Sequence, residues 1–364
     1  MAPVVPTRVL MTADPLGGVW TYAIELARQF DRLGIELGLA TMGAKLTGAQ
    51  RQEISGLRRL TLFESEYRIE WMDNPWDDVA RAGEWLLDIE ARYAPDVVHL
   101  NGYVHGALQW HVPHIVVGHS CKLSWWEAVQ RRAPSLDVDE YRQPVTAGLQ
   151  AADIVVAPTR AMLAALRRQY GELPHAAVIW NARTTDAFAP ANKWPIVLAA
   201  GRVWDQAKNM ALLDGIAPTI PWPVFVAGET TDPSGRQVSL RHATALGPVV
   251  PTRLATLMAH AGIYVLPARY EPFGLSILEA ALSGCALVLG DIDSLRELWD
   301  GVALFVDPDD EVGLGEAIRW LIESPPARDV LAQRARARAL GRTPEAMVTA
   351  YLATYRDAGG VMVA

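Results

Sequence analysis

The sequence predicts an α/β protein made of two doubly wound domains, each a parallel sheet with helices on both faces. The chain has 364 residues, and at roughly 150 residues per domain this length suggests about two domains. Short β-branched runs alternate with amphipathic stretches of helix length, the pattern of βαβ units. The pattern stops in the polar, proline-bearing segment TTDAFAPANKWP at residues 184–195, and a second round of strands and helices follows it. We therefore expect two domains that face each other across a cleft.

The first half of the chain predicts an N-terminal domain over residues 1–183. Its strand candidates are residues 8–13, 36–42, 97–100, 114–119, 153–158 and 177–180. The helix after the first strand has the clearest pattern, because Tyr22, Leu26 and Phe30 recur at four-residue spacing and form one apolar stripe. Gly34 follows the stripe and predicts the end of this helix.

The second half predicts a C-terminal domain over residues 184–340. Its strand candidates are residues 196–202, 223–228, 243–247, 263–268, 286–291 and 303–307. A last helix over residues 344–358 is expected to begin at Thr343 and Pro344, because threonine is a good N-cap and proline a good first helical residue.

Composition and charge exclude several classes of protein. Apolar residues make up 51% of the chain and charged residues 20%, as in globular rather than disordered or fibrous proteins. The net charge of −8 argues against nucleic acid as a partner and leaves at most peripheral contact with a membrane. The sequence contains neither an apolar run of membrane-spanning length nor a secretory signal pattern. Because Cys121 and Cys285 are the only cysteines, a reducing, cytoplasmic location is expected.

Ligands of doubly wound sheets bind at the carboxyl ends of the strands, so the residues that follow each strand are the candidates for function. Gly17 and Gly18 follow the first strand and precede a helix. Paired glycines there allow a backbone to approach a ligand, and the helix N-terminus attracts an anion. The alternative is a tight turn that only requires positive φ. Because no G-x-G-x-x-G motif occurs there, an enzyme that uses a nicotinamide cofactor is disfavoured.

Two cationic residues flank the first loop of the second domain. Arg202 ends the strand at 196–202, and Lys208 opens the next helix. The planar fork of arginine and the mobile ammonium of lysine can converge on one diphosphate without a metal ion. The alternative is a pair of solvated surface charges.

The segment EPFGLSILE contains two acidic residues, Glu271 and Glu279. If a helix begins near Gly274, the two carboxylates are roughly 8–12 Å apart. That separation is wide for the nucleophile and acid of a retaining glycosidase, about 5–5.5 Å, but it suits separate hydroxyl groups of one elongated ligand. Leu275 and Ser276 then offer backbone N–H groups to a phosphate or a sugar. The alternative for Glu279 is an exposed helix carboxylate.

His119 ends another predicted strand and can donate a hydrogen bond to a ligand or stabilise developing charge. Cys121 lies only two residues away and is interpreted as a small packing residue rather than a nucleophile. Trp125 and Trp126 follow at once and are candidates for an acceptor-binding shelf, with core packing as the alternative. The other histidines have no metal-ligand spacing, so no metal site is predicted.

Together these segments resemble the family 4 retaining glycosyltransferases of the GT-B fold. The resemblance rests on five pieces in order along nearly the whole chain: the glycine turn, the strand-end histidine, ADIVVAPTRAM, GR…KN and EPFGLSILEA. The last piece looks like the family's E-x7-E motif. The resemblance implies transfer of a sugar from a nucleoside-diphosphate donor to a saccharide or glycoconjugate acceptor, with retained anomeric configuration and usually without a metal or other cofactor. It also implies that the final helix crosses back onto the N-terminal domain.

The resemblance assigns a role to five catalytic or donor-binding side chains. Arg202 and Lys208 would hold the donor diphosphate, Glu279 would accept from the ribose hydroxyls, and Glu271 would contact hydroxyls of the donor sugar. His119 would touch the sugar near the reacting carbon. The positions expected to reach the donor mainly through the backbone, or through the Ser276 hydroxyl near the phosphates, are Gly17, Gly18, Phe273, Gly274, Leu275 and Ser276.

Two other classes of function remain open on the same frame. One is an epimerase or a phosphorylase. A phosphorylase of this fold needs a lysine bound to pyridoxal phosphate, for which Lys193 and Lys208 are the lysines of the second half. The other is a catalytically inactive protein that binds a sugar nucleotide.

Overall fold

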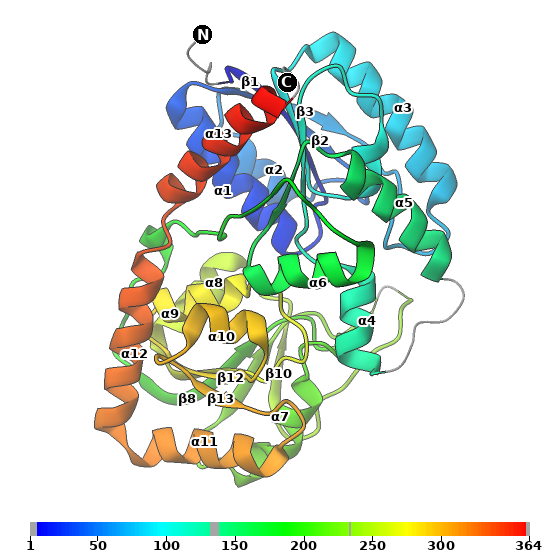
Figure 1. Ribbon diagram of the computed structural model, residues 1–364. Coiled ribbons are helices and arrows are strands. Elements are labelled where there is room, and N and C mark those ends of the chain that lie inside the picture. The colour runs from blue at the N-terminus through cyan, green and yellow to red at the C-terminus, as the bar shows by residue number, and fades with distance from the viewer. Residues whose placement is uncertain (1–5, 132–137, 233, 362–364) are drawn as a thin grey trace. The chain divides into compact units, whose positions relative to one another are not determined.

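The computed structural model describes residues 6–131, 138–232 and 234–361, and the chain divides into two compact units (Figure 1). Unit 1 contains the chain up to Glu127, then Arg132–Ala182, and the C-terminal part from Pro344. Unit 2 contains Ala128–Arg131 and Arg183–Thr343. The main passage from unit 1 to unit 2 therefore comes just before the segment in which the periodicity stops.

Unit 1 is built on a parallel seven-stranded sheet of order β3-β2-β1-β4-β5-β6-β7. Its strands are β1 (Arg8–Ala13), β2 (Glu36–Thr41), β3 (Leu60–Glu64), β4 (Val97–Leu100), β5 (His114–Val117), β6 (Ile154–Ala157) and β7 (Ala176–Val178). Its helices are α1 (Gly18–Leu33), α2 (Gly48–Ile54), α3 (Trp76–Tyr93), η1 (Val104–Ala107), α4 (Lys122–Gln130, the last three residues in unit 2), α5 (Val138–Ala151), α6 (Arg160–Tyr170) and α13 (Pro344–Val361).

Unit 2 is built on a parallel six-stranded sheet of order β10-β9-β8-β11-β12-β13. Its strands are β8 (Trp194–Ala200), β9 (Val224–Ala227), β10 (Thr244–Gly247), β11 (Ala261–Leu266), β12 (Ala286–Gly290) and β13 (Leu304–Val306). Its helices are η2 (Thr185–Ala187), α7 (Met210–Ile216), η3 (Ala217–Thr219), α8 (Pro251–His260), α9 (Leu275–Leu282), α10 (Asp293–Trp299), α11 (Glu311–Glu323) and α12 (Pro325–Leu340).

The predicted fold class is confirmed, and each strand candidate coincides with a strand of the structure. Strand β3 was not predicted. Its sequence LTLFE ends on a carboxylate, and the strand lies at the edge of its sheet with its side chains only partly buried. An edge strand of this kind lacks the continuous apolar run of a buried parallel strand.

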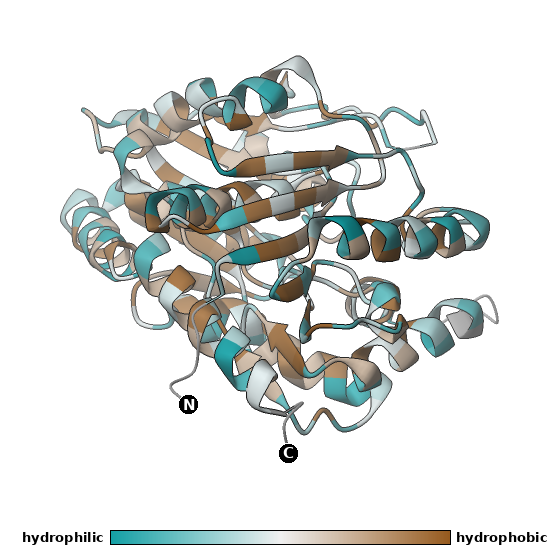
Figure 2. Cartoon of the chain, turned by 90° about the horizontal axis from the view of Figure 1, so that it is seen from above, coloured by the Kyte–Doolittle hydropathy of each residue, from teal (hydrophilic) through white to brown (hydrophobic). Residues whose placement is uncertain are grey.

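Both faces of the sheet in unit 1 are covered, as the alternation along β1 shows. Val9 and Met11 belong to the core cluster that includes α1 and α13, whereas Leu10 belongs to the cluster that includes α3, α5 and α6. Successive strand residues point to opposite faces, so a strand with apolar residues at every position requires helices on both sides. Figure 2 shows the strands largely in the brown of hydrophobic residues and the helices in both brown and teal.

The last helix packs on unit 1. Met347, Tyr351 and Tyr355 of α13 are buried in the same cluster as Phe30 of α1, and Figure 1 shows α13 alongside α1. The prediction that the chain returns to its first domain is therefore confirmed, although the helix extends three residues beyond the predicted end, to Val361. Among the described helices, none is both long enough and apolar enough to cross a membrane.

Candidate active site

The strand order of each sheet reverses direction at one place. In unit 1 the chain runs outward from β1 to β3 on one side and then continues from β4 on the other, and in unit 2 the same change falls between β8 and β11. Connections at such a switch point go to opposite faces of the sheet and leave a crevice outside the strand ends, where ligands of doubly wound folds bind. The predicted site residues of unit 2 follow β8 and β11, the two strands at its switch point.

The loop after β8 is held in a fixed shape by two buried polar residues. Asp205 accepts hydrogen bonds from the backbone N–H of Ala207 (3.0 Å) and from Nη2 of Arg202 (2.8 Å). Asn209 adopts the left-handed conformation (φ 56°), and its Nδ2 donates to the carbonyls of Pro267 and Pro308. These contacts fix the backbone on both sides of Lys208.

Lys208 forms an ion pair with Glu271, with 2.6 Å between Nζ and Oε2. The two side chains are only 16% and 12% exposed, so the pair is shielded from water and its mutual attraction is stronger than that of a surface pair. The prediction had given these residues separate contacts with a ligand. The structure pairs them directly with each other, Lys208 from the loop after β8 and Glu271 from the loop after β11.

Arg202 has a more open environment than Lys208. Its side chain is half exposed, pairs with Asp205, and lies over the ring of Trp204 at 5.2 Å. Stacking on an aromatic face and a carboxylate contact restrict the guanidinium while leaving it accessible to solvent.

Gly274 shapes the approach to α9. It is the N-cap of that helix with φ 85°, and a Cβ atom there would lie 2.7 Å from Cδ1 of Ile277. The positive φ favours glycine, and any side chain there would also have to displace the end of Ile277. The first amides of α9, those of Leu275 and Ser276, have no partner within the helix and supply the positive end of its dipole.

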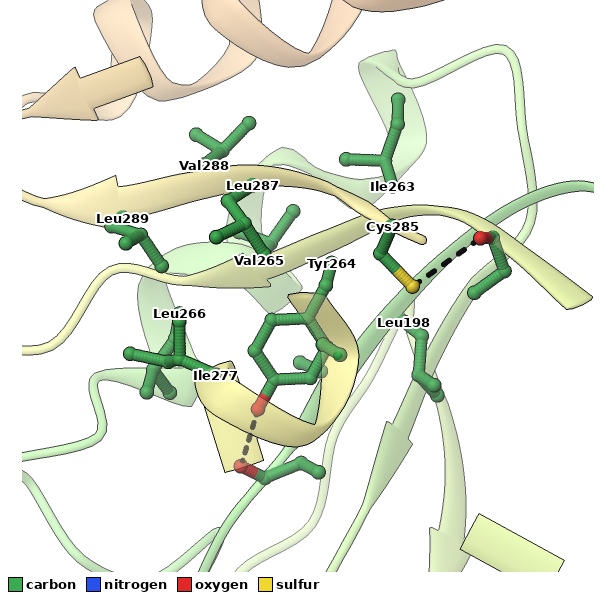
Figure 3. Packing of buried hydrophobic residues seen from close by; sticks show 14 of the residues in the cluster. Leu198, Ile263, Tyr264, Val265, Leu266, Ile277, Cys285, Leu287, Val288 and Leu289 are labelled. Carbon is green, nitrogen blue, oxygen red and sulfur yellow. Dashed lines mark hydrogen bonds between the residues drawn. The ribbon is translucent and has the colours of Figure 1, made fainter. Parts of the chain in front are cut away.

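Ser276 is tied to the core of unit 2 through Tyr264. The Tyr264 hydroxyl donates to Oγ of Ser276 (2.8 Å) and lies 3.2 Å from the Ala200 carbonyl at the end of β8. Tyr264 lies among apolar side chains that include Leu198 and Ile277 (Figure 3), and this burial raises its pKa, so the hydroxyl stays a donor. The Ser276 hydroxyl, predicted to lie near phosphate, therefore has an internal partner in Tyr264.

Glu279 lies inside α9 and is paired with Arg183, with 2.7 Å between Nε and Oε1. Both side chains are largely buried, at 14% for Arg183 and 12% for Glu279, so the alternative of an exposed helix carboxylate is wrong. The Arg183 guanidinium also lies over the ring of Phe188 at 5.2 Å. Arg183 was not predicted, because it stands in an irregular segment with no periodicity or motif to mark it.

The Phe273 side chain is buried in the core cluster of unit 2. Any contact that Phe273 makes with a ligand is thus left to its backbone, as the resemblance implied.

In unit 1, Gly17 is the N-cap of α1 with φ 80°, and a Cβ atom placed on it would have no atom within 4 Å. Gly18 is the first residue of the helix. The turn therefore needs glycine for its conformation, and the backbone at this point is open to a close approach.

His119 follows β5, two residues past the end of that strand, and is partly buried. Its Nε2 lies 2.8 Å from Oδ1 of Asn101, and its ring meets the Tyr22 ring edge-on at 4.5 Å between centroids. Desolvation lowers the pKa of His119 to about 3. The ring is therefore neutral at physiological pH and cannot stabilise charge as a cation.

The remaining predicted residues lie on or beside α4. The rings of Trp125 and Trp126 are both partly exposed, 6.4 Å apart and tilted by 57°, so they do not form one flat shelf. Cys121 is buried with its Sγ 3.0 Å from the Tyr170 hydroxyl, in keeping with a packing role.

Two family models match the chain. The model described as Glycosyltransferase Family 4 matches residues 16–186, and the model described as Glycosyl transferases group 1 matches residues 194–324. The chain is 24% identical to a D-inositol 3-phosphate glycosyltransferase of Corynebacterium diphtheriae over 96% of this chain and 91% of that protein. It is 36% identical over 121 residues to a glycogen synthase of Mycobacterium tuberculosis, and that match spans only 29% of the synthase.

Solved structures give the same assignment of fold. A sucrose-phosphate synthase of Thermosynechococcus elongatus superposes with a TM-score of 0.78 at 18% identity, over 96% of this chain and 98% of the other. Anabaena HepE, solved in complex with UDP and glucose, superposes with a TM-score of 0.74 at 16% identity, over 96% and 99%. With both halves matched by glycosyltransferase family models and with two Rossmann-like units of the expected topology, the chain belongs to the family 4 glycosyltransferases and has the GT-B fold.

Proposed function

We propose that this protein transfers a sugar from a nucleoside-diphosphate sugar to a hydroxyl group of a saccharide or glycoconjugate, with retained anomeric configuration and without a metal ion. The observation that carries the proposal is the shielded Lys208–Glu271 pair at the switch point of unit 2, beside the N-terminus of α9. The cation and the helix amides suit the anionic diphosphate of such a donor and the charge that develops on it as it leaves. The acid suits the hydroxyl groups of the sugar.

The donor diphosphate is assigned to Lys208, Arg202 and the first amides of α9. The ammonium group of lysine has three N–H donors, so Lys208 can keep its contact with Glu271 and still donate to phosphate oxygens. Arg202 is half exposed and presents a planar fork that suits phosphate. Two cations and a helix dipole together neutralise a diphosphate in the way a metal ion otherwise would.

The two acids are assigned to hydroxyl groups at opposite ends of the donor. Glu271 accepts from the sugar and Glu279 from the ribose. Each carboxylate already has a cationic partner, Lys208 or Arg183, and its oxygens have further lone pairs that can accept hydrogen bonds. In unit 1, we assign His119 to the donor sugar near its reacting carbon and the turn at Gly17 and Gly18 to the diphosphate.

The reaction we propose is a front-face substitution. The bond between the anomeric carbon and the diphosphate oxygen breaks, and the acceptor oxygen bonds to the same face of that carbon. The acceptor proton passes to the departing phosphate oxygen, so no side chain becomes covalently attached. Charge develops on the phosphate as the bond breaks, and preorganised cations and dipoles at that point lower the barrier.

The comparisons support the substrate classes of the proposal. HepE is described in complex with UDP-glucose, and relatives of this chain are named as synthases of glycogen and sucrose phosphate or as inositol phosphate glycosyltransferases. These names support a nucleotide-sugar donor and a hydroxyl-bearing acceptor, without choosing one base, sugar or acceptor for this chain.

The phosphorylase alternative is disfavoured by the surroundings of both lysines. Nζ of Lys193 donates to the carbonyls of Ala259 (2.9 Å) and Ser283 (2.6 Å), so it serves to cap the ends of α8 and α9. Lys208 is held by Glu271. Neither lysine is placed to carry a pyridoxal group.

The test is an assay of donor turnover with UDP-, GDP-, ADP- and dTDP-sugars in the presence of EDTA. We expect one donor to release its nucleoside diphosphate, and NMR of the product to show the anomeric configuration of the donor. Binding without turnover of any of these donors would favour the inactive sugar-nucleotide-binding alternative, and an inverted product would contradict retention. Activity lost in EDTA and restored by Mn²⁺ would contradict metal independence.

A fluorinated donor tests the absence of a covalent intermediate. The donor slows any second step and traps an enzyme-bound sugar if one forms. Mass spectrometry of the intact protein is expected to show no sugar adduct, whereas an adduct on Glu271 or on any aspartate would overturn the front-face reaction.

A further inference from the structure

A chain of hydrogen bonds runs through unit 1 from His119 to the C-terminal helix. Asn101, just after β4, contacts both His119 and His99 through its Oδ1, at 2.8 and 3.2 Å from their Nε2 atoms. His99 in turn lies 3.1 Å from the Tyr22 hydroxyl of α1 through Nε2 and 2.6 Å from the Tyr355 hydroxyl of α13 through Nδ1. His99, Tyr22 and Tyr355 are almost completely buried.

The orientation of the Asn101 amide is determined by Thr12 at the end of β1. The Thr12 carbonyl lies 2.7 Å from Nδ2 of Asn101, and the backbone N–H of Asn101 donates to Oγ1 of Thr12 at 2.9 Å. A carbonyl oxygen can only accept, so the amide NH₂ must face Thr12. The Asn101 oxygen therefore faces the two histidines.

This orientation decides where the imidazole protons are. Oδ1 of Asn101 has no proton to give, so Nε2 of His119 must carry the hydrogen that joins them. Nε2 of His99 lies 3.2 Å from the same oxygen and 3.1 Å from the Tyr22 hydroxyl, which can donate or accept. Burial lowers the pKa of each imidazole to about 3, so neither ring gains a second proton at physiological pH.

We infer that Asn101 is a positioning residue that locks His119 as its Nε2–H tautomer, so that His119 offers its substrate a hydrogen-bond acceptor, Nδ1, and not a donor. A neutral imidazole has one N–H and one bare nitrogen, and the N–H of His119 is already used inside the protein. The group that His119 recognises is therefore a hydroxyl that donates to nitrogen. A carboxylate at that position would be repelled by the nitrogen lone pair, and a deoxy position would leave it unmatched. The inference rests on the proposed function only in taking His119 to contact the substrate.

The tautomer is measured directly by long-range ¹H–¹⁵N correlation NMR of the ligand-free protein labelled with ¹⁵N-histidine, with the His119 signal assigned by its loss in His119→Gln. At pH 7 we expect a protonated Nε2 and a bare Nδ1 for His119. The Nδ1–H tautomer, or a doubly protonated ring, would overturn the inference. This result is independent of activity, so failure to find sugar transfer would remove the proposed function and leave the tautomer standing.

Three variants separate positioning from folding. Asn101→Leu removes the acceptor and should convert the His119 signal into a mixture of the two neutral tautomers, whereas retention of pure Nε2–H there would overturn the role of Asn101. Asn101→Asp loses the N–H that faces the Thr12 carbonyl but keeps an acceptor oxygen for His119, so it should restore Nε2–H, and it serves if the leucine variant does not fold. Tyr355→Phe is the matched control, because it removes the hydrogen bond between Tyr355 and His99, which lies at the other end of the same hydrogen-bond network. It should leave the His119 tautomer unchanged.

Kinetics with the donor found in the turnover assay give the second readout. Asn101→Leu removes both the tautomer preference and the hydrogen bond that orients the His119 ring, so it should lower kcat/KM by about tenfold. Asn101→Asp should recover most of that loss, and Tyr355→Phe should stay within about twofold of wild type. Equal losses in Asn101→Leu and Tyr355→Phe would show a merely structural role.

Discussion

Lys208 illustrates how the surroundings of a single side chain decide its function. From the sequence it is one of two cations near a strand end, with solvated surface charge as the alternative. The structure gives it a buried carboxylate partner, Glu271, and a backbone fixed by Asp205 and Asn209. A lysine held in this way is preorganised for an anion, because little side-chain entropy is left to lose on binding.

Replacing Lys208 by methionine tests its role in diphosphate binding. The variant loses a charge that stabilises the leaving phosphate and leaves Glu271 buried without its cation. Transition-state stabilisation should therefore fall by about 2–4 kcal/mol, which lowers kcat/KM roughly 30- to 1,000-fold. Steady-state kinetics measure this loss. Lys45→Met is the matched control, because Lys45 forms an exposed pair with Glu66 (63% exposed on each side) and should change kcat/KM by less than about twofold. Equal effects of the two substitutions would contradict the role given to Lys208.

The buried imidazole of His99 predicts a loss of stability in acid. Its folded-state pKa, about 3, lies below the ordinary value of 6.5, so the folded protein keeps it neutral while the unfolded chain takes up a proton. The stabilisation is complete above pH 6.5 and is lost progressively between pH 6.5 and 3. Between pH 7.5 and 5 the expected loss from His99 is about 2 kcal/mol.

Urea denaturation of wild type and His99→Gln at the two pH values measures that loss. The free energy of unfolding of the variant should fall by about 2 kcal/mol less than that of wild type over the same pH interval. An identical fall in both proteins would show that His99 is not the group that titrates.

Residues in local motifs can be predicted from the sequence, whereas residues whose partners are distant in the sequence cannot. Glu271, Lys208 and Glu279 could be predicted as site residues because they belong to local motifs at strand ends. Arg183 was missed because its partner, Glu279, lies far along the chain and nothing near Arg183 indicates the pairing. Asn101 was missed for the same reason, since its role comes from Thr12 and His119 on neighbouring strands.

At the scale of elements, the turn into α9 depends on one glycine. Gly274→Ala combines a strained positive φ with a 2.7 Å approach to Ile277, so it should shift the helix N-terminus and weaken nucleotide binding. Gly301→Ala is a matched control, because Gly301 has a similar φ of 76° and open space around it. Isothermal titration with the nucleoside diphosphate that binds wild type should show weaker binding for Gly274→Ala alone. Equal affinities of the two variants would contradict the role of the α9 amides.

The C-terminal helix α13 is a structural part of unit 1, and Tyr351 lies fully buried at its centre. Tyr351→Ala should lower the free energy of unfolding by about 3–5 kcal/mol, because it leaves a large cavity between α13 and the sheet. Arg356→Ala, an exposed position on the same helix, should change it by less than about 0.5 kcal/mol. Urea denaturation compares the two, and a small effect at Tyr351 would show that α13 contributes little to the core.

Elements with strong periodicity were predicted well for a physical reason. Helix α1 and the central strands bury a continuous apolar face, and burial of that kind is visible in the sequence. Strand β3 was missed because its sequence LTLFE includes a polar and a charged residue and its side chains are not fully buried. Edge position alone is not the reason, since the edge strands β7, β10 and β13 were predicted.

At the scale of the whole molecule, the two units share one topology. Each sheet begins with an interior strand, adds two strands on one side of it, and then adds the rest on the other side. The strand order could not be read from the sequence, because pairing depends on contacts between segments that are distant in the chain. The strand order nevertheless brings the local motifs together. It makes β8 and β11 neighbours, and so places Lys208 beside Glu271.

A thermal-shift screen of the wild-type protein against UDP, GDP, ADP and dTDP, each repeated with Lys208→Met, tests the central claim most directly. A ligand at about 100 times its Kd adds roughly 2.7 kcal/mol of stability, which gives a clear rise in Tm. We predict that one nucleoside diphosphate raises the Tm of wild type and that the rise is lost in Lys208→Met. No rise with any of the four, or an equal rise in the variant, would contradict the claim that this site of unit 2 holds the diphosphate of the donor.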